Sequence, residues 1–339
     1  MGSSKVLGTI VVGAGLMGRW HARTIERSGG TVVAVVDTDM ERARELAAKH
    51  RGSRATDDLA AALEMNGARV GHLCTPADSH VALAEQCLAA GCHVLAEKPL
   101  APTATATRRL LDRAASAGLL VCPVHQFLFQ RGVERARSLV GMIGPLRHLD
   151  TIACSAGAVG RSAAAHDEIV RDILPHPLSL FANLTGGPIG SIEWRALHHA
   201  PGELRAWGEI DGVSLALTVS LSGRPTRNSL RLVGEAGTVH VDLFHGYSVL
   251  ERGAATPTRK ALRPFALATA TLRAATVNMA VRTTRWEPAY PGLRELVRGF
   301  YRAVRNGDAA PISARETIEV ARARDAVMRR MNSTASVPT

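Results

Sequence analysis

The feature that most constrains this chain is the string G-A-G-L-M-G at residues 13–18, because of the segments on either side of it. The apolar run LGTIVV precedes it and the amphipathic segment LMGRWHARTIER follows, so the string joins a strand to a helix. In such a turn Gly13 allows the tight bend, Gly15 lets the backbone approach a pyrophosphate, and Gly18 lets the helix pack on the strand. Leu16 and Met17 would then present free helix N–H groups to the phosphates. The pattern predicts a dinucleotide site; an ordinary glycine turn is the alternative.

Asp37 supports the nucleotide interpretation, because it ends the next apolar strand, TVVAVVD. A carboxylate there accepts hydrogen bonds from the hydroxyls of the adenosine ribose. A 2′-phosphate would be repelled by Asp37 and by Asp39, and no arginine directly follows Asp37. The sequence therefore favours NAD over NADP as the cofactor.

Apolar runs alternate with amphipathic helical patterns over residues 5–124, which predicts a doubly wound parallel sheet with helices on both faces. Beyond a helix expected at 131–142 the pattern changes. After another expected helix at 166–184, strand-like runs follow one another without long helices between them, which predicts a mainly antiparallel sheet. Helices are expected again at 291–306 and 314–331. We expect an α/β fold in two domains, a Rossmann domain at 1–124 and an α+β substrate-binding and oligomerisation domain at 125–339.

Composition narrows the function classes. The net charge of +11 either steers anionic substrates or reflects arginines spread over solvated helix faces. Aromatic residues make up only 4%, and no nucleic-acid motif is visible, so nucleic acid is not expected as a partner. No run of about 18 apolar residues predicts a membrane span, and no signal peptide is recognisable at the start. The five cysteines fit reduced thiols in a cytoplasmic protein, and no metal site is expected.

The segment 260–285 is basic and amphipathic. One interpretation is a helix that touches a membrane surface or a lipid-like substrate. The interpretation that we favour is a helix that covers the sheet or forms a subunit contact.

Two short segments follow strands at the sheet edge where this fold binds ligands: Thr75-Pro76, and Glu97-Lys98-Pro99. An ammonium group at Lys98 could hydrogen-bond a substrate oxygen and stabilise the alkoxide that develops during hydride transfer. From spacing alone, a plain surface lysine is an equal alternative.

Three motifs together make the chain resemble the Gfo/Idh/MocA family, to which glucose–fructose oxidoreductase and inositol dehydrogenase belong. They are G-A-G-x-M-G, then T-P-x-x-x-H (Thr75, Pro76 and His80), and then A-G-x-H-V-L-x-E-K-P (residues 90–99). The likeness continues along most of the chain. It implies a Rossmann domain followed by an α/β domain whose open sheet often mediates dimers or tetramers, so we expect a homodimer or homotetramer.

The resemblance also implies roles for individual residues. Lys98 corresponds to the family lysine that binds the reacting hydroxyl or carbonyl, and Glu97 and Pro99 shape the nicotinamide-ribose side. We expect Thr75, Pro76 and His80, as well as Glu97 and Lys98, to be among the cofactor-binding residues. The family motif D-x-x-x-H matches Asp172 and His176, with Pro175 between them. His176 would exchange the hydroxyl proton, and Asp172 would orient the substrate or stabilise the imidazolium.

The chain departs from the family after the last Rossmann strand, where a polar-Arg pattern is common. This sequence has His125 and Gln126 there, which we expect to face the substrate, and the family's pocket arginine is absent. The residue three after His176 is Ser179, where the family often has Asp.

The sequence therefore predicts an NAD(P)-dependent dehydrogenase or reductase, with NAD favoured, that acts on a secondary alcohol or ketone of a sugar, cyclitol or nucleotide-linked sugar. Two alternatives stay open. One is a nucleotide-sensing regulator on the same fold that performs no chemistry. The other is a sugar hydrolase or epimerase that retains its NAD through a redox cycle.

Overall fold

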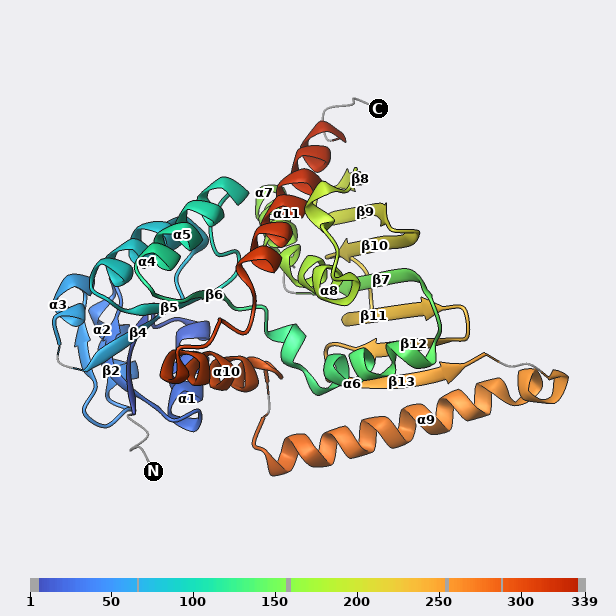
Figure 1. Cartoon of the computed structure of the whole chain (residues 1–339), viewed down its shortest axis with the longest axis horizontal. Coiled ribbons are helices and arrows are strands. Elements are labelled where there is room, and N and C mark those ends of the chain that lie inside the picture. Colours follow the sequence, from blue (N-terminus) through green and yellow to red (C-terminus); the bar gives the residue numbers. More distant parts are fainter. Residues whose placement is uncertain (1–5, 66, 157–159, 254–255, 288, 335–339) are drawn as a thin grey trace. The chain divides into compact units, whose positions relative to one another are not determined.

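The chain divides into two compact units in the structure, a computed structural model that describes residues 6–65, 67–156, 160–253, 256–287 and 289–334 (Figure 1). One unit comprises Met1–His125 with Leu293–Ala321, and the other comprises Gln126–Gly292 with Arg322–Thr339. The first change of unit lies at His125, next to the expected boundary at 124. Residues 293–321 return to the first unit, whereas the expected division assigned all residues after 124 to the second domain.

The first unit is built on a six-stranded sheet in the order β3-β2-β1-β4-β5-β6. All of its strand pairs are parallel, as the alternation of apolar runs and helices predicted. The strands are β1 (Leu7–Val12), β2 (Gly30–Val36), β3 (Arg54–Thr56), β4 (Ala68–Leu73), β5 (His93–Ala96) and β6 (Val121–Pro123). The strand order reverses between β1 and β4, the place where such sheets bind ligands beyond their carboxyl ends.

Five helices connect these strands: α1 (Leu16–Arg27), α2 (Met40–Ala47), α3 (Leu59–Leu63), α4 (His80–Ala89) and α5 (Ala104–Ser116). Side chains cap several of them; Asp39 accepts the first N–H groups of α2, and Thr103 does the same for α5. A sixth helix, α10 (Leu293–Asn306), comes from the far end of the chain and contacts α1. It buries Leu296, Val297, Phe300 and Tyr301.

The second unit is built on a seven-stranded sheet in the order β13-β12-β11-β7-β10-β9-β8. Only β7 and β10 pair in parallel, which confirms a mainly antiparallel sheet. The strands are β7 (Leu146–Cys154), β8 (Arg195–Ala200), β9 (Glu203–Ile210), β10 (Val213–Ser220), β11 (Arg227–Gly234), β12 (Gly237–Asp242) and β13 (Tyr247–Arg252). Leu215, Leu217 and Val219 of β10 are buried and alternate with half-buried residues, so one face of the sheet carries the core.

The helices α6 (Arg131–Leu139), α7 (Ala163–Ile173) and α8 (Pro175–Thr185) belong to this unit, and α11 (Ala314–Thr334) ends in it. The single helix expected at 166–184 is therefore two helices, divided at Leu174. Pro175 is the reason, because proline has no N–H to continue the hydrogen-bond ladder. Helix α8 ends at Gly186, whose φ of 66° is the left-handed conformation that glycine adopts readily.

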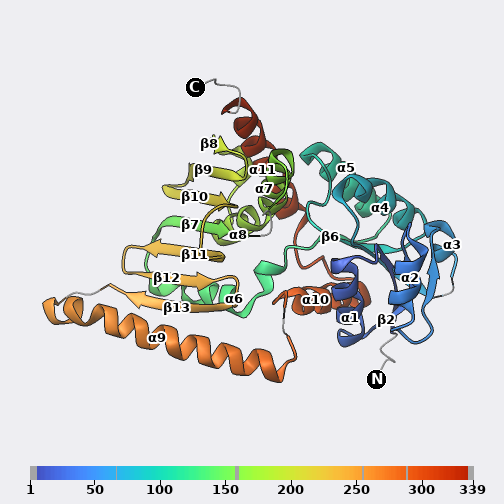
Figure 2. The same cartoon turned by 180° about the vertical axis from the view of Figure 1, so that it is seen from behind.

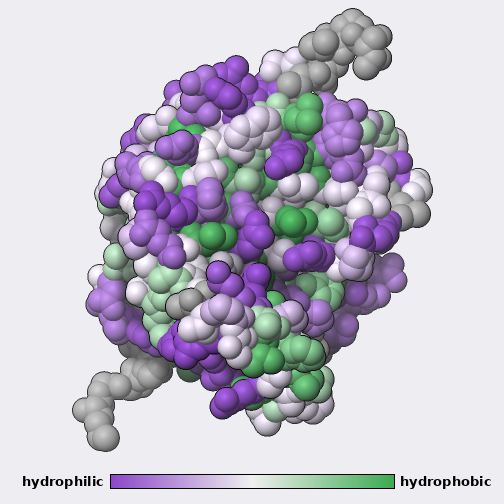
Figure 3. Space-filling model, turned by 90° about the vertical axis from the view of Figure 1, so that its right-hand side faces the viewer, coloured by the Kyte–Doolittle hydropathy of each residue, from purple (hydrophilic) through white to green (hydrophobic). Residues whose placement is uncertain are grey.

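The basic segment at 260–285 lies in a long helix, α9 (Pro257–Thr284), that contacts β13 at the edge of the sheet (Figures 1 and 2). None of its residues is buried, and Phe265, Leu272 and Met279 are 67–72% exposed. On the face of the molecule drawn in Figure 3, hydrophobic and hydrophilic residues are interspersed. Among the described residues, no helix combines the length and apolar character needed to cross a membrane.

Candidate active site

The glycine turn predicted from the sequence is crowded at two of its glycines and open at the third. At Gly13, with φ of 96°, an added Cβ would lie 2.8 Å from the Cys74 carbonyl oxygen, and at Gly18 it would lie 1.8 Å from the Gly13 oxygen. At Gly15, by contrast, a Cβ would meet no protein atom within 4 Å. Gly15 is also the N-cap of α1 and brings no capping side chain, so the first N–H groups of α1, beginning with Leu16 and Met17, are left for a ligand. An open helix N-terminus of this kind is a common position for binding phosphate groups.

Asp37 follows β2 and holds the turn in place. Its Oδ2 accepts from the backbone N–H of Ala14 at 2.6 Å, and its Oδ1 accepts from that of Asp39 at 2.9 Å. A carboxylate has about four acceptor positions, so these bonds leave capacity for ribose hydroxyls. Asp39 caps α2 and forms an ion pair with Arg42 at 3.1 Å, which places a second carboxylate near the same corner.

His80, which was expected among the cofactor-binding residues, is fully buried. Its Nδ1 lies 2.9 Å from the carbonyl oxygen of Pro99, and its Nε2 lies 2.9 Å from that of Thr75. The imidazole thus joins the loop after β4, which contains Thr75 and Pro76, to the loop after β5, which contains Lys98. Its observed contacts are those of an internal brace.

Glu97 and Lys98 follow β5 directly. Glu97 is almost fully buried, and burial by itself would raise the pKa of its carboxyl; the hydrogen bond from His21 and the charges of His21 and Lys98 outweigh burial and lower it. Lys98 is half-buried, and its backbone N–H donates to Glu97 Oε2 at 3.3 Å. The loop therefore carries an ionised carboxylate beside an ammonium group.

His125 closes the first unit next to this pair. Burial, and then the positive charge of Lys98, lower the pKa of its imidazole to about 4, with Glu97 acting in the opposite direction. The ring is therefore neutral at pH 7. Its Nδ1 is buried and has no hydrogen-bond partner among the described residues, and the same holds for Oε1 of Gln126, the first residue of the second unit. Buried polar atoms of this kind are expected where a ligand supplies the partner.

The second unit contains Asp172 and His176. His176 is half-buried in the first turn of α8, and its ring stacks on Phe127, with centroids 4.4 Å apart and planes inclined by 25°. A cavity of about 10 Å³, room for one water molecule, lies beside it and is lined by Thr151 of β7 and Asn228 of β11. Asp172 lies on α7, on the other side of the break at Leu174; it is exposed, and its charge acts on Arg324 of α11.

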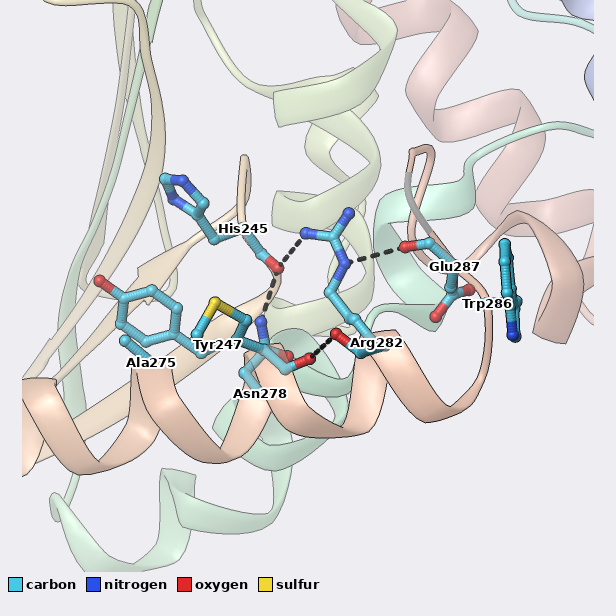
Figure 4. A pocket seen from close by; sticks show the side chains of 9 residues that line it. His245, Tyr247, Ala275, Asn278, Arg282, Trp286 and Glu287 are labelled. Carbon is cyan, nitrogen blue, oxygen red and sulfur yellow. Dashed lines mark hydrogen bonds between the residues drawn. The ribbon is translucent and has the colours of Figure 1, made fainter.

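A groove of about 650 Å³ in the second unit is lined by none of the predicted residues (Figure 4). It follows α9, where the backbone oxygen of His245 accepts from Asn278 and Arg282, and Arg282 also donates to the backbone oxygen of Glu287. A further groove of about 680 Å³ covers sheet residues such as Asp150 and Arg231. No set of three or more His, Cys, Asp or Glu side chains within the described ranges could hold a metal ion.

Sequence reasoning missed three buried polar residues behind Glu97: His21, His72 and Tyr301. A signal was present, because His72 interrupts the apolar strand ARVGHL and Thr9 interrupts LGTIVV. A polar residue in such a run requires a buried hydrogen-bond partner.

The comparisons with known proteins concern the first unit above all. Residues 7–125 match the GFO_IDH_MocA model, described as an oxidoreductase family with an NAD-binding Rossmann fold. Inositol 2-dehydrogenase 4 of Saccharopolyspora erythraea is 37% identical over 118 residues, 34% of this chain and 35% of the relative. Inositol 2-dehydrogenase of Leifsonia xyli is 34% identical over 191 residues, 54% of this chain and 55% of the relative. The matches thus span between about a third and about half of these curated relatives.

Solved structures match the whole fold. UDP-N-acetylglucosamine 3-dehydrogenase of Acidithiobacillus ferrooxidans superposes with a TM-score of 0.77 at 20% identity, over 97% of this chain and 99% of that one. Levoglucosan dehydrogenase, solved with NADH and levoglucosan, gives a TM-score of 0.78 at 16% identity, over 97% and 98%. At these identities the likeness shows the architecture of both units.

Proposed function

We propose that this chain is an NAD-dependent dehydrogenase or reductase that acts on a CH–OH group or the corresponding ketone. The match of residues 7–125 to the Gfo/Idh/MocA oxidoreductase model, with its NAD-binding Rossmann fold, supports the proposal. The observation that carries the proposal is the glycine turn, which is open at Gly15 and closed at Gly13 and Gly18. The carboxylates of Asp37 and Asp39 favour NAD over NADP, because a 2′-phosphate would add negative charge beside them.

Bound NAD supplies a hydride acceptor, or in reduced form a hydride donor, and the chain's own residues manage charge and protons. Lys98 would donate a hydrogen bond to the substrate oxygen and stabilise negative charge on it. A preorganised donor of this kind contributes about 2.7–4 kcal/mol, or 10²–10³ in rate. Glu97 would hold the ammonium in place, and the neutral His125, together with Gln126, would offer polar atoms to the ligand.

We assign the proton exchange to His176. An imidazole exchanges protons near neutral pH, and general acid–base catalysis contributes about 10²–10⁴. Its ring stacks on Phe127, a contact that favours this orientation of the imidazole plane. Asp172 lies four residues before His176 in the sequence, and we assign it to the orientation of the substrate. The proposal requires Lys98 and His176 to act on the same substrate oxygen.

The substrate class that we propose is a sugar, cyclitol or nucleotide-linked sugar. The relatives support it, since inositol dehydrogenases are among those matched in sequence and sugar dehydrogenases among those matched in fold. The net charge of +11 favours an anionic, nucleotide-linked member of this class. We further propose that the chain works in the cytoplasm as a homodimer or homotetramer.

The test follows nicotinamide absorbance with NAD and a panel of cyclitols, free sugars and nucleotide-linked sugars. With an accepted substrate, we expect Lys98→Met to lose at least 10² in kcat and His176→Gln a similar factor, while NADH still binds. Lys49→Met and His199→Gln change the same residue types at exposed positions and are the matched controls. Full turnover by Lys98→Met would refute the assigned role. Cofactor that copurifies and cycles without net NADH release would indicate the hydrolase or epimerase alternative.

A further inference from the structure

A continuous chain of buried hydrogen bonds runs through the first unit, away from the Lys98 loop. His21 Nε2 lies 3.1 Å from Glu97 Oε1, and His21 Nδ1 lies 2.9 Å from His72 Nδ1. His72 Nε2 is 3.2 Å from the hydroxyl of Tyr301, which is 2.8 Å from Thr9 Oγ1. The chain ends where the Thr9 hydroxyl donates to the Leu7 carbonyl oxygen at 3.3 Å.

The chain connects distant segments in the dry interior of the unit. Its members come from β1, α1, β4, the end of β5 and α10. The two histidines, Thr9 and Tyr301 have no solvent exposure, and Glu97 is 8% exposed. Bulk solvent does not reach the middle of the chain, so we expect its donors and acceptors to be satisfied within it.

The hydrogen-bond directions can be followed from the Leu7 end. If Thr9 donates to Leu7, it must accept from Tyr301, and Tyr301 must then accept from Nε2–H of His72. Burial, followed by the charge of His21, lowers the pKa of His72 well below its usual value, so His72 is neutral and its Nδ1 is an acceptor. The proton in the His21–His72 bond therefore belongs to His21. Since His21 also donates to the ionised Glu97, it carries protons on both nitrogens.

The reverse direction contains one proton fewer. Thr9 would donate to Tyr301, Tyr301 to His72, and His72 to a neutral His21 that still donates to Glu97. The bond from Thr9 to Leu7 would then be lost. The two proton arrangements differ in the charge of His21, which lies beside Glu97. Which arrangement forms depends on the direction of the hydrogen bonds made by the hydroxyls of Tyr301 and Thr9.

We propose that His21, His72, Tyr301 and Thr9 form a proton-holding relay whose hydroxyl end keeps His21 an imidazolium, and thereby keeps Glu97 ionised and the Lys98 loop positioned. These are positioning residues, because they act on the ligand site through Glu97. Their effect on catalysis rests on the proposed function, whereas the protonation state of His21 does not. Through Tyr301, α10 becomes part of the cofactor unit's ligand site.

Other ionisable groups face the relay. Lys98 and His21 both lower the pKa of Glu97, and the charge of Glu97, after burial, raises that of the Cys74 thiol. His125 lies within the influence of Lys98 and Glu97. At the other end the Arg305 guanidinium is 6.0 Å from the centre of the Tyr301 ring. Burial raises the pKa of Tyr301 far above its usual value, so its hydroxyl keeps its proton.

The test is ¹⁵N NMR of the full chain labelled at histidine, at pH 7, with His21 and His72 assigned by substitution. In the wild type we expect both ring nitrogens of His21 to be protonated and His72 to be the neutral Nε2–H tautomer. Tyr301→Phe removes the hydroxyl but keeps the ring, so His72 loses its acceptor and is expected to shift to the Nδ1–H tautomer. His21 then becomes neutral, a loss of one proton.

Thr9→Val is an independent variant, because without the Thr9 hydroxyl Tyr301 can only donate to His72, and Thr9→Ser should restore the wild-type spectrum. Tyr247→Phe, on β13 of the second unit, is the matched control and should leave His21 unchanged. A neutral His21 in the wild type, or an unchanged His21 in both Tyr301→Phe and Thr9→Val, would overturn the proposal. Because this measurement needs no substrate, it separates failure of the relay from failure of the proposed activity.

Discussion

Gly15→Ala should remove NAD binding with little effect on folding. Gly15 has φ of −68°, which alanine adopts without strain, and the new Cβ meets no protein atom within 4 Å. Alanine is a poorer N-cap than glycine, but it also reduces the freedom of the unfolded chain by about 0.4–1 kcal/mol. The two effects oppose each other, so the free energy of unfolding should change by less than about 1 kcal/mol.

The affinity should change much more. The methyl group would occupy the space through which a pyrophosphate approaches the backbone, and each lost N–H hydrogen bond to a charged phosphate costs about 1.5–3 kcal/mol. One lost bond weakens binding by about 10- to 150-fold. Calorimetric titration with NADH measures Kd, and urea unfolding checks the fold. Gly141→Ala is the matched control, because a Cβ there also meets nothing within 4 Å. An unchanged Kd in folded Gly15→Ala would refute a phosphate site at this turn.

Three further predictions follow from the same geometry. Asp37→Asn keeps a hydrogen-bond acceptor but removes a negative charge. At about 5 Å and an effective dielectric constant near 20, that charge repels a 2′-phosphate by about 3 kcal/mol. The preference for NADH over NADPH, measured as the ratio of their Kd values, should therefore fall at least tenfold. The pKa of His125 in the folded state, about 4, lies below its value in the unfolded chain, so the unfolded chain binds the proton first as the pH falls from 6.5 to 4. Over that range the free energy of unfolding, measured with urea, should fall by about 3 kcal/mol more for the wild type than for His125→Gln. Residues 1–125 alone lack the buried side chains of α10. Four of these, Leu296, Val297, Phe300 and Tyr301, account for about 6–12 kcal/mol of burial, so the fragment should show no cooperative unfolding by circular dichroism.

The sequence predicted the architecture well wherever periodicity was strong. The parallel sheet, the glycine turn and the mainly antiparallel second sheet follow from apolar runs of the right length and spacing. The shortest elements gave no clear signal in the sequence, because β3 has three residues and α3 has five, too few for either period to repeat. The helix break at Leu174 shows that Pro175 ended one helix and began another, a choice that periodicity alone does not reveal.

The candidate site was predictable where a motif names the residue and unpredictable where burial decides its role. Asp37 and Lys98 are found at strand ends, as their positions in the sequence indicate. His80 belongs to the T-P-x-x-x-H motif, yet its ring contacts the carbonyl oxygens of Thr75 and Pro99 and so joins two loops. The assignment of Asp172 and His176 to catalysis stays a prediction, and the structure adds the stack of His176 on Phe127.

The return of residues 293–321 changes how the nucleotide domain should be understood. A six-stranded parallel sheet with its own helices is usually regarded as an independent N-terminal domain, and the motifs of this chain encourage that interpretation. Here Phe300 and Tyr301 are fully buried in the same unit as the glycine turn, and Gly30 must lack a side chain because a Cβ there would lie 2.5 Å from the Tyr301 ring. The hydroxyl of Tyr301 is also hydrogen-bonded to His72. Helix α10 therefore both completes the core of the first unit and, in our proposal, sets the protonation of the histidines behind Glu97. Packing and charge at the ligand site therefore depend on residues almost 300 positions after the glycine turn. A local sequence motif does not predict a contribution from residues so far along the chain.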